Sequence, residues 1–169
     1  MTDLVLTLIG PDRPGLVESV AARVAAHGGN WLESRMAHLA GQFAGILRVE
    51  VPPERVADLR AALLELEGEG LRVVAQGGAP PRLEGRRVLR LYAEGQDHPG
   101  IVRDISQALK RHGVNIEELT TDRRDAPMTG GQLFRARARL YVPETLDVER
   151  LRRDLETIAA DLMVELTLD

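Results

Sequence analysis

The sequence predicts an α+β protein of two ferredoxin-like domains, each with the order βαββαβ and two helices on one face of a four-stranded antiparallel sheet. An internal repeat is the first observation behind this prediction. Residues 12–17 (DRPGLV) return as 97–102 (DHPGIV), and 27–30 (HGGN) return as 112–115 (HGVN), both 85 residues later. Two blocks in register indicate a duplicated domain. Alternating strand patterns and paired helical patterns in both halves are the other observations.

The first elements of the repeat are a strand and a helix. Residues Leu4–Ile9 form a short β-prone run that Gly10-Pro11 end. Helical periodicity follows through Leu16, Val20 and Val24, until Gly28-Gly29 end the helix. Pro14 suits a first turn, and Asp12 is placed to cap it. We therefore expect a strand that turns directly into a capped helix.

The rest of the first half supplies two strands, a helix and a last strand. Residues 30–39 are expected to be a second strand, and 43–51 alternate as a half-buried strand does. Four apolar residues then recur at helical spacing: Val56, Leu59, Leu63 and Leu66. A last strand is expected around Leu71–Ala75.

The second half repeats these elements with an insertion. The alternating strand recurs around 134–142 at a spacing of 91 rather than 85, which places six extra residues near Asp122–Gly131. A helix follows, with Val148, Leu151, Leu155 and Ile158 as its apolar positions, and then a strand around Leu162–Leu168. We expect domains at 1–78 and 88–169, joined by a Gly- and Pro-rich linker at 79–87.

Composition excludes several classes of protein. The net charge is −4, from 22 basic and 26 acidic residues, which disfavours a dedicated nucleic-acid binder. The absence of cysteine excludes disulfides and thiolate metal sites. The N-terminus does not resemble a signal peptide, and no apolar run approaches the ~20 residues of a membrane span. We expect a cytoplasmic protein without membrane contact. Because domains of about 80 residues bury little core, we also expect a homodimer.

The repeated DxPG turn is the candidate site. It lies at a helix N-terminus, where free amides and the helix dipole suit a carboxylate ligand. Asn30 and Asn115 follow the helix ends and can both donate and accept hydrogen bonds, as an amino acid requires. The alternative is purely structural, because Asp, Pro and Gly are also ordinary residues of a helix start.

These segments resemble the ACT domain, a small regulatory module of amino-acid metabolism. The resemblance rests on GPDRPGLV at 10–17, GGNWLE at 28–33, LTT at 119–121 and APMTGGQLF at 126–134. The tandem pair is similar to the glycine cleavage system transcriptional repressor family. The resemblance implies a protein that binds a small amino acid, with glycine the best guess, at domain interfaces, and that controls metabolism or transcription through a protein partner. It implies no catalysis, cofactor, metal or direct DNA binding. The ligand residues it implies are Asp12, Gly15, Asn30, Asp97, Gly100 and Asn115.

Other functions stay open. A constitutive assembly module that senses no ligand is the main alternative, and a nucleic-acid binder comes next. An enzyme is disfavoured: His27 and His112 fit surface positions at helix ends, and Asp97-His98 resembles an acid–base pair, but Arg13 replaces the histidine in the first half. Arg135, Arg137 and Arg139 would share one face of a strand. They could dock an acidic partner or a nucleic-acid backbone, or form a solvated face balanced by acids.

Overall fold

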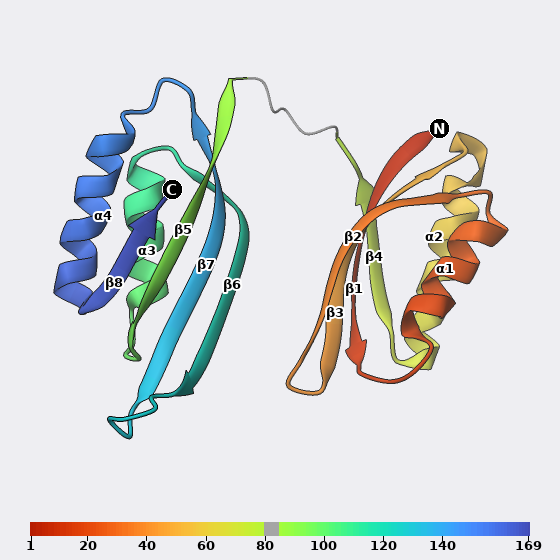
Figure 1. Cartoon of the computed structure of the whole chain (residues 1–169). Helices are drawn as coiled ribbons and strands as arrows, with labels where there is room; N and C mark the ends of the chain where they lie inside the picture. The colour runs from red at the N-terminus through yellow and green to blue at the C-terminus, as the bar shows by residue number, and fades with distance from the viewer. Residues whose placement is uncertain (80–84) are drawn as a thin grey trace. The chain divides into compact units, whose positions relative to one another are not determined.

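The computed structural model describes residues 1–79 and 85–169 (Figure 1). The chain divides into two compact units, Met1–Pro81 and Arg82–Asp169, called unit 1 and unit 2 below. Most of the expected linker, at 80–84, lies outside the described residues. Its last residues, Arg86 and Arg87, are the first residues of a strand.

Unit 1 has the expected βαββαβ order. Its main elements are β1 (Thr2–Pro11), α1 (Leu16–Ala26), β2 (Asn30–Leu39), β3 (Gln42–Val51), α2 (Val56–Leu64) and β4 (Arg72–Gly77). Short 3-10 turns at Pro53–Arg55 and Glu65–Glu69 flank α2. The antiparallel sheet has the order β2-β3-β1-β4, and both helices cover one face of it (Figure 1).

Unit 2 repeats this arrangement. Its elements are β5 (Arg86–Gln96), α3 (Ile101–Arg111), β6 (Asn115–Asp125), β7 (Gln132–Pro143), α4 (Val148–Leu162) and β8 (Val164–Leu168). The sheet order is β6-β7-β5-β8, again antiparallel, with both helices on one face (Figure 1). The predicted fold class is therefore confirmed.

Strand alternation directs each core toward its helices. In β1, Leu4, Leu6 and Leu8 are buried, while the residues between them lie on the outer face of the sheet. The helices contribute matching apolar stripes, such as Leu16, Val20 and Val24 of α1. Each unit thus has its own aliphatic core, and no polar side chain is buried among the described residues.

The two hairpins differ as the repeat spacing predicts. In unit 1, Ala40 and Gly41 alone connect β2 to β3, with φ of 50° and 79°. Two consecutive positive φ angles form the turn type that matches the twist of a tight hairpin. In unit 2, residues 126–131 take their place between β6 and β7. The insertion therefore extends a loop and leaves the strand order unchanged.

Equivalent glycines in β1 and β5 allow close packing of the chain. A Cβ on Gly10 would lie 2.6 Å from the carbonyl oxygen of Gly70, and one on Gly95 would lie 2.7 Å from that of Met163. Any larger residue would push away the segment that leads into β4 or β8. Among the described helices, none is long and apolar enough to cross a membrane.

Candidate functional site

The turn between β1 and α1 begins the helix without a side-chain cap. The N-cap residue is Gly15, with φ of 90°, and its unit 2 counterpart is Gly100, with φ of 101°. This left-handed conformation favours glycine. The expectation that Asp12 caps the helix is wrong, and Asp97 does not cap its helix either: no side chain makes a cap hydrogen bond at α1 or α3. Each aspartate lies three residues before the N-cap.

Both aspartates instead connect the turn to the neighbouring hairpin. The Asp12 N–H donates to the carbonyl oxygen of Gly41 at 2.9 Å, and its carboxylate lies 3.7 Å from His38 Nε2. In unit 2, the Asp97 carboxylate lies 3.2 Å from Arg123 Nη1. Sequence reasoning missed these partners. The repeat could have found them, since His38 and Arg123 are 85 residues apart and both side chains can carry positive charge.

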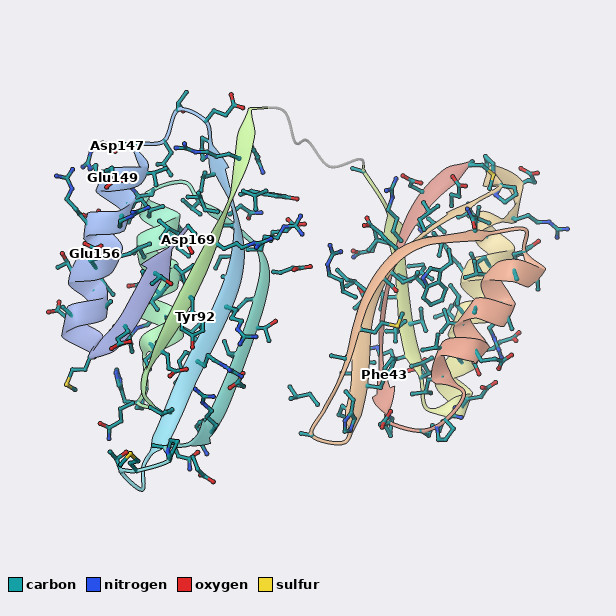
Figure 2. The ribbon with its side chains drawn as sticks, viewed as in Figure 1. Phe43, Tyr92, Asp147, Glu149, Glu156 and Asp169 are labelled. Atoms are coloured by element: carbon teal, nitrogen blue, oxygen red, sulfur yellow. The ribbon has the colours of Figure 1, made fainter. Side chains whose placement is uncertain are left out.

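The absence of a cap leaves the first turn of α1 open. The Ser19 N–H donates to Gly15 O at 2.9 Å and closes the first helical hydrogen bond. The N–H groups of Leu16, Val17 and Glu18 precede it and have no intrahelical acceptor. These residues line a hollow of about 450 Å³ with Asp12, Arg13, Gly15 and Phe43, the last of which is labelled in Figure 2. Amides and the positive end of the helix dipole therefore border an open space.

The residue at position x of the DxPG turn, Arg13 or His98, contacts a main-chain carbonyl oxygen in both units. Arg13 Nη2 donates to the carbonyl oxygen of Glu69 at 2.7 Å. His98 Nε2 lies 2.7 Å from the carbonyl oxygen of Leu162, and its Nδ1 lies 3.1 Å from that of Pro99. Each side chain ties the turn to the end of the unit's second helical segment. The contacts with the carbonyls of Leu162 and Pro99 raise the pKa of His98.

The asparagines lie at the opposite end of each sheet. Asn30 pairs with Glu50, which pairs with Asp3 at the start of β1. The DxPG turn follows the end of β1, so about 25 Å of strand separates it from Asn30. In unit 2, Asn115 likewise pairs with Tyr141, far from the turn at Gly100. The structure therefore brings Asp12 and Gly15 together, and Asp97 and Gly100 together, but not the asparagines.

The predicted arginine row has acidic neighbours. Arg135 donates to Asp122 Oδ2 from Nε at 3.0 Å and from Nη2 at 2.6 Å, which lowers the pKa of the Asp122 carboxyl. Arg139 donates to the Tyr141 hydroxyl at 3.1 Å and lies over its ring. Arg137 makes no hydrogen bond or ion pair within the described part of unit 2. The row is therefore not a continuous positive stripe.

The helix-end histidines are both partly buried. His27 and His112 are the C-cap residues of α1 and α3. The side chain of His112 is only 10% exposed and makes a 2.6 Å contact with Asp154 of α4, so the surface expectation is wrong for it. No cluster that could hold a metal ion occurs among residues 1–79 and 85–169.

Comparison with known proteins finds a family model that matches the first unit. Residues 2–75 match the family model of the ACT domain. The glycine cleavage system transcriptional repressor of Escherichia coli (strain K12) is 24% identical over 165 residues, which cover 94% of this chain and 85% of the relative. The matched segment of this chain thus includes both units.

Two solved structures share the whole architecture. An unknown protein from Galdieria sulphuraria is 28% identical, with a TM-score of 0.85 over 99% of this chain and 97% of that one. A protein provisionally described as a glycine cleavage system transcriptional repressor is 19% identical, with a TM-score of 0.72 over 99% and 96% of the two chains. The latter similarity establishes the fold alone.

Proposed function

We propose that this chain, a protein of two tandem ACT domains, is a non-catalytic regulator that binds a small amino acid and transmits the bound state to a protein partner. The uncapped first turn of α1 carries the proposal, because its free amides border a hollow beside Asp12 and Gly15. An amino acid's carboxylate suits those amides. Its ammonium group suits the Asp12 carboxylate.

A second chain would complete the site. β1 and β2 run in the same direction, because each pairs antiparallel with β3. β2 is an edge strand whose end, near His38, lies beside the Asp12 turn. If the β2 strands of two chains pair antiparallel, the start of one lies beside the end of the other. Asn30 of one chain then approaches the Asp12 turn of its partner, which makes the ligand part of a homodimer interface.

Glycine is the proposed ligand. The relative's name connects it with glycine metabolism and with repression of transcription. In this chain, a net charge of −4 opposes direct binding to a DNA backbone, so we assign the transcriptional step to a protein partner. Ligand binding would act by population shift, favouring the packing in which the interface is closed.

The two units differ in the partner of the turn aspartate. In unit 1 the Asp12 carboxylate is 3.7 Å from His38, a partner that is charged only when protonated. In unit 2 the Asp97 carboxylate is 3.2 Å from Arg123, whose charge is permanent. Arg123 competes with a ligand ammonium group for Asp97. We therefore propose unit 1 as the stronger site.

Thermal unfolding of the whole chain with each of the twenty amino acids tests the proposal. A ligand at a hundredfold excess over its Kd adds about 2.7 kcal/mol of stability if it binds only the folded state. We expect glycine or another small amino acid to raise Tm, and Asn30→Ala to reduce the shift more than Asn115→Ala. These exposed residues are matched controls for each other. No shift with any amino acid would overturn the proposal.

A constitutive assembly module is the second candidate, and the outer face of the first sheet favours it. Ile9 and Ile46 are each 48% exposed there, and Val74 is 44% exposed. They lie on adjacent strands, as the pairing of Thr7 with both Ile46 and Val74 shows. An apolar sheet face is typical of a protein contact. Oligomer size that is independent of every amino acid would favour this candidate.

A further inference from the structure

The outer face of the second sheet, opposite α3 and α4, carries an ordered array of polar side chains. Strand pairing places Glu118, Arg139, Arg90 and Asp169 in one row across the sheet. The next row is Thr120, Arg137, Tyr92 and Thr167. A hollow of about 490 Å³ is bordered by both rows. Figure 2 labels Tyr92 on β5 and Asp169 at the end of β8.

Acids beyond the hollow are already engaged. Asp122 accepts two hydrogen bonds from Arg135, at 3.0 and 2.6 Å. Glu94 accepts hydrogen bonds from the Tyr92 hydroxyl at 2.6 Å and from Arg124 Nη2 at 2.8 Å. These contacts lower the pKa of both carboxyl groups. Both carboxylates are held by these partners, and Asp122 also interacts electrostatically with Arg137.

Three arginines and two acidic residues, Glu118 and Asp169, border the hollow. Arg90 is directly opposite Arg139 on the neighbouring strand, an arrangement that is destabilising for like charges. Arg137 lies two residues from Arg139 on the same face, about 6.8 Å away. The side chains of Arg90 and Arg137 make no hydrogen bond or ion pair within residues 85–169. Glu118 and Asp169 flank the first row beside Arg139 and Arg90, whereas Arg137 lies in the second row, whose other members are uncharged.

Arg139 is held by an aromatic neighbour, Tyr141, which follows it on β7 on the side away from Arg137. Its Nη2 donates to the Tyr141 hydroxyl at 3.1 Å, and its guanidinium carbon lies 5.7 Å from the centre of the Tyr141 ring. Thr120 and Thr167 add hydroxyl donors on the two sides of the second row.

We propose that this hollow, centred on Arg137, binds a small oxyanion ligand, either a phosphate ester or a compact polycarboxylate. Guanidinium groups match the oxygens of both chemistries by paired hydrogen bonds. An oxyanion would also relieve the repulsion between Arg90 and Arg139. The volume lies within the range of about 300–1,000 Å³ that is usual for small-molecule sites. The site lies on the sheet face opposite the helices and is independent of the DxPG turns.

Calorimetric titration of the full chain with inorganic phosphate, and separately with citrate, tests this site. Ionic strength is held constant with chloride, because screening alone weakens contacts with exposed charges. We expect at least one probe to bind with a millimolar or lower Kd. Binding of phosphate alone identifies a phosphate ester as the ligand class, and binding of citrate alone identifies a polycarboxylate.

Two variants make the test specific. Arg137→Gln is expected to weaken binding about tenfold or more, which corresponds to about 1.4 kcal/mol. Arg111→Gln removes an exposed charge at the end of α3 and is expected to bind as the unaltered chain does. Equal weakening by both variants, an unchanged Kd in Arg137→Gln, or the absence of binding by both probes would overturn the proposal.

Discussion

His98 and Leu162 are joined by a 2.7 Å contact between the imidazole Nε2 and a main-chain carbonyl oxygen. The other ring nitrogen, Nδ1, lies 3.1 Å from the carbonyl oxygen of Pro99. Because a carbonyl oxygen only accepts, both contacts are hydrogen bonds only when both nitrogens carry protons. The protonated ring therefore fastens the β5–α3 turn to the end of α4, as Arg13 fastens the corresponding turn of unit 1 to Glu69.

This geometry predicts a pH-dependent contribution to the stability of unit 2. The folded-state pKa of His98 is raised by its hydrogen bonds to Leu162 and Pro99. The contribution is thus complete below the unfolded-state pKa of about 6.5, and it is lost as pH rises through the higher folded-state pKa. Hydrogen exchange of unit 2 amides, followed as pH rises from below 6.5 through the folded-state pKa, measures this contribution to stability. His98→Arg should remove this part of the pH dependence; an identical profile in the variant would contradict the assignment.

The left-handed conformation at the helix start predicts a backbone cost at Gly15. A Cβ there meets nothing within 4 Å, so Gly15→Ala isolates the conformational penalty. We expect a loss of about 1–2 kcal/mol of unfolding free energy. Gly10→Ala is the contrasting variant, because its Cβ would lie 2.6 Å from the Gly70 carbonyl oxygen. Chemical denaturation should show a greater loss of unfolding free energy for Gly10→Ala than for Gly15→Ala. A smaller loss for Gly10→Ala would be inconsistent with this packing.

The tight hairpin of unit 1 predicts a stabilising substitution. Ala40 has φ of 50°, a conformation that alanine adopts at a cost. Asparagine tolerates it and is favoured in such two-residue turns. We expect Ala40→Asn to add about 0.5–1 kcal/mol, from the difference in turn preference. Ala37→Asn, within β2, is the control and should not stabilise. A lower midpoint of denaturation for Ala40→Asn would refute the turn assignment.

Because each unit has its own core, we expect a cavity-forming core substitution to destabilise only the unit that contains it. Leu6 is fully buried in the core of unit 1, which contains no residue of unit 2. Leu6→Ala should cost about 2–5 kcal/mol. Hydrogen exchange should then show faster opening for amides of β1, β3 and β4, while those of β5 and β7 keep their protection. Equal loss of protection in both units would show that they unfold together.

The fold was largely predictable because strand alternation and helical periodicity are local. The sequence predicts a strand at residues 30–39, and β2 has those bounds. The helix cap was not predictable in the same way. Asp12 has the residue type of a cap, but the positive φ of Gly15 moves the N-cap three residues further along the chain. That choice depends on hairpin contacts such as Asp12 N–H to Gly41 O.

The placement of the candidate residues followed only in part from the sequence. The repeat identified Asp12 and Gly15, which line one hollow, and their counterparts in unit 2. The distance of Asn30 from them follows from topology, since β1 and β2 point the same way and their starts share one end of the sheet. That argument was available from the predicted fold. Ion pairs between the turn and the hairpin, such as Asp97 with Arg123, could be predicted only with knowledge of the register of the strands.

Amide chemical shifts of the whole chain during a glycine titration test the central claim most directly. We predict saturable shifts at Leu16, Val17 and Glu18, whose amides are uncapped. We also predict one at Asn30, the first residue of β2, at the opposite end of the sheet. If the resonances of both regions shift together and the protein becomes the size of a dimer, the ligand is held between two chains. Unchanged shifts at the first turn of α1 with glycine and every other amino acid would contradict the account.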